Sequence, residues 1–547
     1  MTPKEPPARP ARFARFLSQA GLVALSALAG AAAFPPLEWS ALAWISLAPL
    51  FLVFERTSSR WGFLWAYVHG VIFYTAGLWW FTEVSGLGLA VTVFHLGFFQ
   101  VTAGLPVFVA RKRLRLPYVA VAGAAWVGME YLRSFVLTGF AWLYLGHTQW
   151  RSIEMIQISD ATGAYGVSFL VATAGGAAAD LVIQWRSRSE RGEESASTVS
   201  KRRWHPWVTV AVPLFLVVAA NQYGAWRIGQ EDFRIGPRVA IVQGNISQAL
   251  KKKKEVAQPS ISEVMEIHLA LSIEACCSDP PPDLLVWPET MVPGYLDSDP
   301  VFFSQLQDLA RTRGVRLLVG SNSYEPLPGG EYRKGNSCFY FDEEGRLIGR
   351  YDKIHLVPVG EYNPYAAFFP RTNEVIFGTA GFLPDLSPGE APYVGKLTAR
   401  GETSRFGVLV CYEEIFPALV RSFCEDDVDF LVLATNDAWW GDSFEYEQFL
   451  AIGVFRAIEN RVSLVRAGNT GISCVIDPAG RIPDEAILRV DGQWKNVRGH
   501  LVADVPIDGR RSPYSIVGDL FARVCLGGTG FALVLACIPR SRRSRPT

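Results

Sequence analysis

Eight apolar stretches constrain this chain more than any other feature. Most of them approach the ~20 residues that an α-helix needs to cross the hydrocarbon core of a bilayer. Half of the 547 residues are hydrophobic and 19% are charged, which suits a partly membrane-embedded protein. A buried core helix is the alternative for any one stretch, but not for all of them together. The stretches are 16–34, 41–54, 61–81, 87–110, 118–137, 163–183, 207–220 and 520–538.

Lysine and arginine alternate along the loops between these stretches. Loops 82–86 and 138–160 carry few of them. Because positive charge marks the cytoplasmic side, seven crossings place residues 224–518 outside the cytoplasm, with both termini inside. The basic segments are Arg9, Arg12 and Arg15, Arg56 and Arg60, residues 111–115, residues 186–203, and residues 540–545.

Three details of this half leave alternatives open. Ala27-Leu28-Ala29 resembles a signal-peptide cleavage site, although we expect the first helix to be retained; cleavage would not change the side of later segments. The stretches 41–54 and 207–220 are short for a crossing. Glu130 and Arg133 lie three apart on one helix face, so they can pair with each other, and a functional role is the alternative.

Residues 224–518 have a different pattern, with short apolar strands alternating with helical segments. This alternation predicts a layered α/β domain. We therefore expect a membrane domain at 1–223, a catalytic domain at 224–518, and a C-terminal helix with a basic tail at 519–547. The charge run Lys251–Lys254 is read as a solvated loop, with attraction to lipid headgroups as the alternative. Expected strands are 238–245, 284–287, 315–320, 336–341, 346–351, 406–410, 430–434, 463–467, 472–476 and 501–505, and expected helices are 261–277, 300–312, 417–425 and 446–460.

Cys411 stands where an apolar strand meets a turn. A rigid strand would fix the sulfur while the turn opens it to substrate, but a thiol needs a base or a nearby cation to become a nucleophile. Glu289 ends another strand, and Lys353 with Glu361 follows a third. A small buried core residue is the alternative for a lone cysteine.

The order of these motifs resembles the nitrilase, or carbon–nitrogen hydrolase, superfamily, whose triad is Glu, Lys and Cys. The matching segments are Trp287-Pro288-Glu289, Asp352-Lys353-X-His355-Leu356-X-Pro358-X-Gly360-Glu361 and Cys411-Tyr412-Glu413. With the membrane stretches and Gly139-Phe140-Ala141-Trp142, the chain resembles the apolipoprotein N-acyltransferase family. The resemblance implies a multi-pass α-helical membrane domain plus an α/β nitrilase-like αββα sandwich. One departure is Gln248-Ala249-Leu250-Lys251-Lys252, where these acyltransferases commonly have Gln-X-X-Lys-Trp.

The resemblance also implies roles for the matching residues. Glu289 is expected to be the general base and Cys411 the nucleophile. Lys353 is expected to stabilise the oxyanion together with the backbone N–H of Tyr412, and its charge to favour the thiolate. Glu361 falls on the superfamily's second acid, an orienting or auxiliary base. Tyr412 and Glu413 are expected to support the site.

Aromatic segments near these motifs are candidates for binding the substrate. Trp439 and Trp440 lie in the segment 436–442, which resembles the family's Asn-Asp-Ala-Trp-Phe-Gly loop. Tyr362 opens an aromatic-rich segment, 362–370, that could dip into lipid as a lid. Core packing is the alternative for these rings.

The function implied is transfer of a fatty acyl chain from a phospholipid, through a thioester on Cys411, to the N-terminal diacylglyceryl-cysteine of apolipoproteins. The expected location is the bacterial inner membrane, and the expected partners are phospholipid, lipoprotein and membrane lipids. No cofactor and no metal are expected, and the formal net charge of +0 gives no reason to expect a nucleic acid. The alternatives are a membrane-tethered amidase or nitrilase acting on a small C–N substrate, and a non-catalytic scaffold.

Overall fold

The computed structural model describes residues 9–189, 205–246, 261–363 and 386–538. It divides into two compact units, one formed by Met1–Arg227 with Asp519–Thr547 and the other by Ile228–Gly518. Three sequence features lie outside the described residues: the Lys251–Lys254 run, the basic tail 540–545, and the proposed lid after Asn363. The domain limits and the number of crossings expected from the sequence stay predictions.

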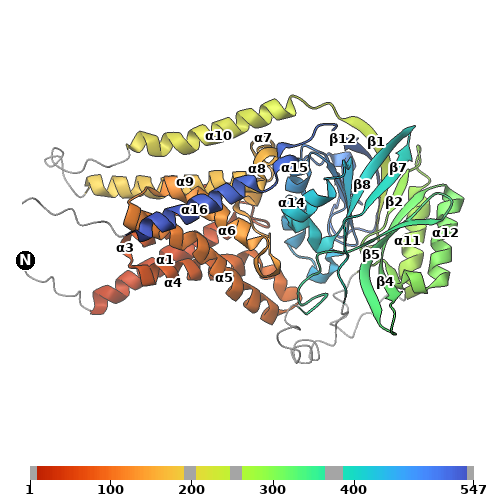
Figure 1. Cartoon of the computed structure of the whole chain (residues 1–547), viewed down its shortest axis with the longest axis horizontal. Helices are drawn as coiled ribbons and strands as arrows, with labels where there is room; N and C mark the ends of the chain where they lie inside the picture. The colour runs from red at the N-terminus through yellow and green to blue at the C-terminus, as the bar shows by residue number, and fades with distance from the viewer. Residues whose placement is uncertain (1–8, 190–204, 247–260, 364–385, 539–547) are drawn as a thin grey trace, which may run out of the picture. The chain divides into compact units, whose positions relative to one another are not determined.

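The first unit is entirely helical (Figure 1). Five of its helices are long and apolar enough to cross a membrane, judged by length and composition over the described residues. They begin in α1, α5, α9, α10 and α16. The helices are α1 (Arg9–Ala32), α2 (Ser40–Ser46), α3 (Ala48–Arg56), α4 (Ser59–Gly77), α5 (Gly86–Val109), α6 (Tyr118–Arg133), α7 (Ile153–Ile156), α8 (Ser159–Thr162), α9 (Ala164–Ser189), α10 (Pro206–Ile228) and α16 (Leu520–Cys537).

Two expected helices differ from the sequence prediction. The stretch 41–54 is not one helix, because α2 ends at Ser46 and α3 begins at Ala48. Pro49 lies in the first turn of α3 and has no N–H to continue the preceding helix, which accounts for the break. The seventh stretch is longer than expected, because α10 continues to Ile228 and takes in residues assigned to a linker.

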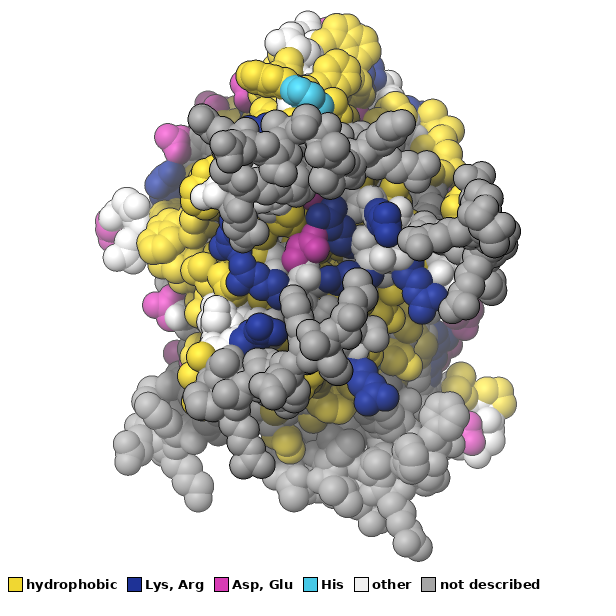
Figure 2. Space-filling view, turned by 90° about the vertical axis from the view of Figure 1, so that its left-hand side faces the viewer, with side chains coloured by type: hydrophobic (Ala, Val, Ile, Leu, Met, Phe, Trp, Pro, Cys, Tyr) yellow, Lys and Arg dark blue, Asp and Glu magenta, His cyan; other side chains and the backbone are white. Residues whose placement is uncertain are grey.

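Basic side chains gather at one end of the helical unit. Figure 2 looks onto this end and shows Lys and Arg over much of its described surface. Arg111 and Lys112, just after α5, bind Glu55 at the end of α3, and Arg111 Nη1 also lies 3.7 Å from Asp180 Oδ1 of α9. Arg56 and the last turn of α9 add further positive charge. This clustering in three dimensions matches the loop charges read from the sequence.

Glu130 and Arg133 do not bind each other as their spacing suggested. Glu130 Oε1 accepts hydrogen bonds from Trp126 Nε1 at 2.9 Å and from the Leu145 backbone at 2.7 Å. The Arg133 guanidinium donates to the carbonyls of Trp142 and Leu143, at 2.5 and 3.3 Å. Both side chains therefore hold the irregular segment 142–145, whose main-chain groups need partners that no helix supplies.

The second unit consists of two sheets between layers of helices (Figure 1). The seven-stranded sheet has the order β12-β1-β2-β4-β5-β6, with β3 beside β4, and the five-stranded sheet has the order β11-β10-β9-β8-β7. The first contains β1 (Arg234–Gln243), β2 (Leu284–Val286), β3 (Val292–Tyr295), β4 (Arg316–Pro326), β5 (Tyr332–Phe341), β6 (Leu347–Asp352) and β12 (Gly499–Ile507). The second contains β7 (Val394–Ala399), β8 (Glu402–Val410), β9 (Phe430–Thr435), β10 (Ser463–Gly468) and β11 (Cys474–Ile476).

The sheets face each other and are covered on their outer sides by two helices each. Helices α11 (Ile261–Ala275) and α12 (Pro300–Arg313) pack on the larger sheet, and α13 (Pro417–Phe423) and α14 (Glu445–Asn460) on the smaller one. The ring of Tyr340 on β5 meets that of Phe406 on β8 at 5.2 Å between the two sheets. Trp287 and Phe339 belong to a fully buried core under α11 and α12. This is the expected αββα arrangement.

Most strands and helices of this unit fall where the sequence pattern indicated them, but β3 and β7 were not predicted. The β3 segment Val-Pro-Gly-Tyr contains a proline and a glycine, which argue against a strand. The β7 segment Val-Gly-Lys-Leu-Thr-Ala has weak alternation and lies at the sheet edge. In both cases pairing with a neighbouring strand overrides a weak local preference.

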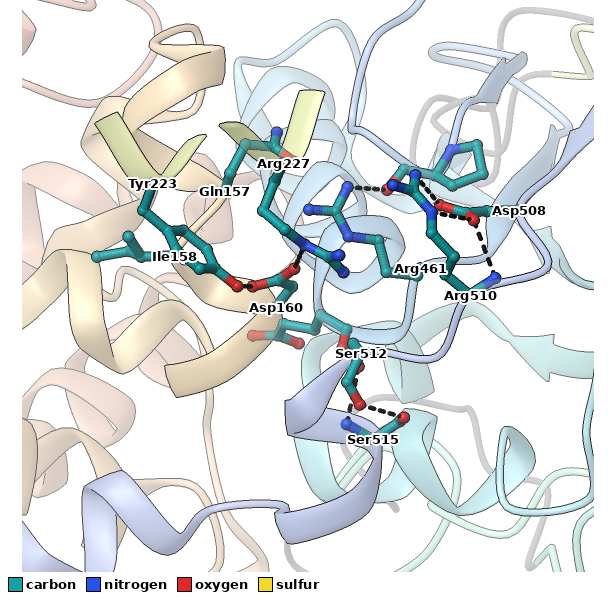
Figure 3. Close-up of polar contacts among 12 residues, drawn as sticks. Gln157, Ile158, Asp160, Tyr223, Arg227, Arg461, Asp508, Arg510, Ser512 and Ser515 are labelled. Carbon is teal, nitrogen blue, oxygen red and sulfur yellow. Dashed lines mark hydrogen bonds and ion pairs between the residues drawn. The ribbon is translucent and has the colours of Figure 1, made fainter. Parts of the chain in front are cut away.

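The chain passes from one unit to the other after Arg227 and after Gly518, and polar contacts within each unit hold the segments near these limits (Figure 3). In the helical unit, Asp160 of α8 accepts hydrogen bonds from the Tyr223 hydroxyl and from Arg227 Nε of α10, both at 2.6 Å. In the α/β unit, Ser512 caps the short helix α15 (Pro513–Val517) by accepting from the Ser515 backbone at 2.8 Å. Each boundary is therefore anchored by partners inside its own unit.

Candidate active site

Strand ends carry the three residues expected to form the triad. β8 runs parallel to β9 and ends at Val410, so Cys411 emerges at its carboxyl end. Glu289 follows β2, which is parallel to both β1 and β4. Gly320 of β4 allows this position, because a Cβ there would overlap the Pro288 carbonyl oxygen and crowd Glu289. Lys353 directly follows β6.

Lys353 lies between two carboxylates. Its Nζ is 3.6 Å from Glu289 Oε1 and 2.9 Å from Glu361 Oε2, and the side chain is 1% exposed. Asn336 Nδ2 donates to Glu289 Oε1 at 2.6 Å and to Glu361 Oε1 at 2.9 Å. The Val357 backbone N–H donates to Glu361 Oε2 at 2.7 Å. Glu361 is therefore held in place by Lys353, Asn336 and Val357, and the orienting role expected for it stays a prediction.

The pKa values of Lys353 and Glu289 both lie above their ordinary values. Burial acts to lower the pKa of Lys353, but the carboxylates of Glu361 and Glu289 outweigh it, so the pKa lies above its ordinary value. Burial raises the pKa of Glu289, while Lys353 opposes that shift and Glu361 adds to it. Lys353 therefore stays charged, and Glu289 is a stronger base than an exposed glutamate.

Cys411 is held in a sparsely populated backbone conformation beside Glu289. Its φ of 50° lies in the left-handed region, which is unusual for a residue with a side chain. The thiol lies within hydrogen-bonding reach of Glu289 and of the hydroxyl of Thr435, which follows Ala434, the partner of Val410 in the β8–β9 pair. The sharp change of direction after the strand turns the sulfur toward the base.

The thiol of Cys411 is not a preformed thiolate. Burial and the charge of Glu289 raise its pKa well above the ordinary value, although Lys353 acts to lower it. Lys353 does act to lower the pKa of Cys411, as the sequence predicted, but burial and Glu289 raise that pKa by more. A base must therefore remove the proton, and Glu289 is the neighbour that can do so.

Glu413 connects the two sheets at the site. Its Oε1 accepts from the Tyr351 hydroxyl at 2.6 Å, from the Ile354 backbone at 2.7 Å and from the His355 backbone at 3.1 Å, while Oε2 accepts from the Val410 backbone at 2.8 Å. These donors flank Lys353 on one sheet and Cys411 on the other. Glu413 thus sets the distance between the lysine and the cysteine, a supporting role in the sense expected from the motif.

The aromatic candidates are divided between the surface and a ring cluster. Trp439, in the 3₁₀ turn Asp437–Trp440, is 38% exposed, and Trp440 beside it is partly buried. Tyr412 stacks edge-on against Phe416 at 5.0 Å, and His355 lies 3.9 Å from Phe416 between ring centres. Tyr362 is partly buried and bridges to Pro358. Core packing, the alternative for these rings, does not fit the exposed Trp439.

Two asparagines at the site were not predicted as functional. Asn336 binds both glutamates, and the Asn436 backbone N–H donates to Glu289 Oε2 at 3.0 Å. The sequence pattern marks Asn436 only as the first residue of the tryptophan segment 436–442, and Asn336 only as the first residue of the expected strand 336–341. For Asn436, its position directly after the buried strand β9 was the signal that could have identified it, whereas Asn336 lies within β5 and no local signal marks it.

A second buried ionic cluster lies behind the turn that carries Cys411. Arg466 Nη1 is 2.9 Å from Glu414 Oε2, and Arg466 Nη2 is 2.8 Å from Asp437 Oδ2. Asp437 Oδ1 also accepts from the Thr435 hydroxyl at 2.7 Å. Glu414, which follows the Cys-Tyr-Glu motif and is not covered by it, therefore belongs to the support of the loop rather than to the triad.

The comparisons with known proteins cover both units. Residues 26–177 match the family model of the apolipoprotein N-acyltransferase N-terminal domain, and residues 238–492 match that of carbon-nitrogen hydrolase. Among solved structures, an amidase from Nesterenkonia sp. aligns at 20% identity and a TM-score of 0.34, over 53% of this chain and 93% of that one. The carbon-nitrogen hydrolase match, with the two facing sheets, confirms the expected fold class of the second unit.

Curated relatives match almost the whole chain. The apolipoprotein N-acyltransferase of Chlorobaculum tepidum is 28% identical over 529 residues, which cover 92% of this chain and 93% of the relative. That of Geobacter metallireducens is 36% identical over 529 residues, which cover 94% of each. The family models match both the membrane half and the α/β half, and the relative at 36% identity covers 94% of the chain. The chain therefore belongs to the apolipoprotein N-acyltransferase family.

Proposed function

We propose that this protein N-acylates lipoproteins, using Glu289, Lys353 and Cys411 as its catalytic triad. The observation that carries the proposal is the convergence of a thiol, a buried carboxylate of raised pKa and a charged lysine at one set of strand ends. The donor is a phospholipid, and the acceptor is the α-amine of an N-terminal diacylglyceryl-cysteine. Membership of the family supports this substrate pair over a small C–N substrate.

The first half-reaction loads the enzyme. Glu289 removes the thiol proton, and Cys411 Sγ attacks the carbonyl carbon of a phospholipid ester. Lys353 and the backbone N–H of Tyr412 stabilise the negative charge on the carbonyl oxygen. The ester C–O bond then breaks, and Glu289 returns its proton to the departing alkoxide. The products are a thioester on Cys411 and a lysophospholipid.

The second half-reaction discharges the thioester. The neutral α-amine of the acceptor attacks the thioester carbonyl, and Glu289 accepts one of the amine protons. The same oxyanion donors stabilise the tetrahedral intermediate. The C–S bond breaks, the sulfur regains its proton from Glu289, and the acceptor leaves with a new amide bond. Trp439, Trp440 and Tyr362 are proposed to contact the acyl chains and to exclude water from the thioester.

The proposed location is a bacterial inner membrane, with the α/β unit on the extracytoplasmic side. The basic end of the helical unit supports this orientation, because cytoplasmic ends of membrane helices carry the excess of Lys and Arg (Figure 2). Cysteine labelling at Lys253 and at the C-terminus should then report opposite sides of the membrane. Labelling of both positions from one side would contradict the orientation.

Loading by phospholipid alone tests the proposal. The purified protein, incubated with phospholipid, should gain the mass of one fatty acyl chain on Cys411 and keep it until a diacylglyceryl-cysteine peptide is added. Cys411→Ser should show little thioester and little transfer, because a hydroxyl is much harder to ionise than a thiol. Folded wild-type protein that stays unmodified after lipid incubation would contradict the acyltransferase assignment. An amidase would react with a small amide instead, and a scaffold with neither substrate.

A further inference from the structure

Asn436 carries a buried hydrogen-bond donor without a partner in the described part of the chain. The side chain is 1% exposed, and its Nδ2 has no hydrogen-bond partner among the residues that the structure describes. A buried donor without a partner costs about 1–3 kcal/mol, and native proteins contain few of them. Such a group next to a catalytic base therefore calls for a ligand.

The orientation of the Asn436 amide is fixed by its neighbours. Asn469 Oδ1 accepts from the Ile246 backbone N–H at 2.9 Å, and Asn469 Nδ2 donates to the Ile246 carbonyl at 2.8 Å. Asn469 cannot be turned over without losing both bonds. Its Nδ2 also donates to Asn436 Oδ1 at 2.9 Å. The oxygen of Asn436 is thus committed to Asn469, and the NH₂ group is the end that remains available.

The donor lies within the reacting region. The backbone N–H of the same residue binds Glu289 Oε2 at 3.0 Å, and the preceding residue, Thr435, is the hydrogen-bonded neighbour of Cys411. A substrate that brings a carbonyl carbon to Cys411 and a leaving or attacking group to Glu289 must pass beside Asn436. The strongest uncharged hydrogen-bond acceptors that both substrates carry are carbonyl oxygens.

We propose that the side-chain N–H of Asn436 binds a substrate carbonyl oxygen, either an ester carbonyl of the phospholipid or the peptide carbonyl next to the acceptor amine. The inference rests on the proposed function, whose two half-reactions separate the two sources. Asn436 is then a substrate-binding residue, distinct from Lys353 and Tyr412, which face the carbonyl under attack. A carbonyl oxygen fits because the donor is neutral and already lies beside a carboxylate, where a second anion would be repelled.

The test compares three variants of the full-length protein in detergent. Asn436→Asp keeps the size and the acceptor for Asn469 but loses the N–H donor. Asn436→Ala loses both. Asn469→Ala is the matched control, because it removes the same bond between the two asparagines while leaving the donor in place. Loading of Cys411 from dipalmitoyl-phosphatidylglycerol micelles and discharge by a synthetic diacylglyceryl-cysteine peptide are each measured against substrate concentration.

Both Asn436 variants should lower kcat/KM about three- to tenfold, mainly through KM, in the half-reaction whose substrate supplies the carbonyl. Asn469→Ala should lower it less. The pH dependence of Cys411 alkylation by iodoacetamide should stay unchanged in Asn436→Ala, which shows that the cysteine and its base are intact. A defect in loading alone identifies the phospholipid ester, and a defect in discharge alone identifies the peptide carbonyl.

Two results would overturn the inference. One is that folded Asn436→Asp and Asn436→Ala show normal KM in both half-reactions. The other is that Asn469→Ala reproduces their defects in full, which would reduce Asn436 to a structural role. Wild-type protein that never loads from phospholipid would instead contradict the proposed function, and the inference would fall with it.

Discussion

Two buried clusters lie near the Cys411 turn, and each contains one basic side chain between two acidic side chains. In one, Lys353 lies between Glu289 and Glu361, at 3.6 and 2.9 Å. In the other, Arg466 lies between Glu414 and Asp437, at 2.9 and 2.8 Å. The residue types of a cluster therefore do not tell whether the cluster takes part in catalysis or stabilises the fold.

The clusters differ in what surrounds them. The guanidinium of Arg466 is covered by the ring of Phe449 at 4.2 Å, and Arg466, Glu414 and Asp437 are all fully buried. The lysine cluster instead adjoins a thiol, and both Asn336 Oδ1 and Asn436 Nδ2 beside it lack partners among the described residues. Because Glu414 Oε1 also lacks a partner among the described residues, unused polar atoms do not separate the two clusters. The adjoining thiol distinguishes the lysine cluster, whereas the covered arginine cluster, called the closed cluster below, supports the loop.

The largest effect should come from breaking the closed cluster. Arg466→Met leaves Asp437 buried without its cation and Glu414 without its hydrogen-bond donor, which should lower the free energy of unfolding by about 3–5 kcal/mol or prevent folding. Thermal denaturation of the purified protein measures it. Arg489→Met is the control, since its pair with Asp484 is largely exposed and should matter little. A normal melting temperature for Arg466→Met would show that the closed cluster is not structural.

Removing the cation of the other cluster should affect the rate more than the fold. Lys353→Met should lower the rate of Cys411 loading by a factor on the order of a hundred or more, because the oxyanion loses its charged donor. Glu289 and Glu361 can take up a proton to relieve the remaining charge. Rapid-quench mass spectrometry gives the rate, with the exposed Lys396→Met as control. Near-normal loading by folded Lys353→Met would remove the lysine from the mechanism.

A smaller effect is expected for Glu413→Gln. The amide keeps one acceptor oxygen where the carboxylate serves four donors, so the spacing of Lys353 and Cys411 should loosen. A displacement of this kind should lower kcat roughly tenfold or more while KM changes little. Steady-state transfer assays resolve the two parameters. An unchanged kcat would indicate that other contacts set this distance.

The smallest effect should come from the next residue, Glu414. Burial raises its pKa to about 8, so at neutral pH it is largely protonated, and Glu414→Gln should change stability by less than about 1 kcal/mol. Because the folded pKa lies above the unfolded value, this group stabilises the fold at low pH. That contribution is lost as the pH rises from about 5 through 8. Glu414→Gln should flatten the dependence of melting temperature on pH in this range; an unchanged slope would contradict the shift.

Part of the candidate site could be predicted from the sequence because several of its residues lie in short sequence motifs. Glu289, Lys353 and Cys411 each follow a recognisable strand, and their order matches a known motif. Asn336 lies within β5 and Asn436 follows β9. An asparagine side chain is neither ionisable nor nucleophilic, so the sequence alone does not mark it as a catalytic candidate. The contacts of both asparagines are with glutamates distant in the chain, and only the folded sheets bring the Asn336 amide and the Asn436 backbone N–H to within 2.6 and 3.0 Å of Glu289.

The sequence by itself determined the membrane half, the alternation of strands and helices, and the choice of Cys411, Glu289 and Lys353 as the proposed nucleophile, base and oxyanion donor. These follow from hydrophobic periodicity and from short motifs, which act over a few residues. The tertiary structure alone decided that burial raises the pKa of the Cys411 thiol, that Glu130 and Arg133 hold a loop, and that Lys353 lies near Cys411 while Arg466 lies under the Phe449 ring. Protonation and partner choice depend on burial and on charges brought together from distant segments, and no local pattern encodes either.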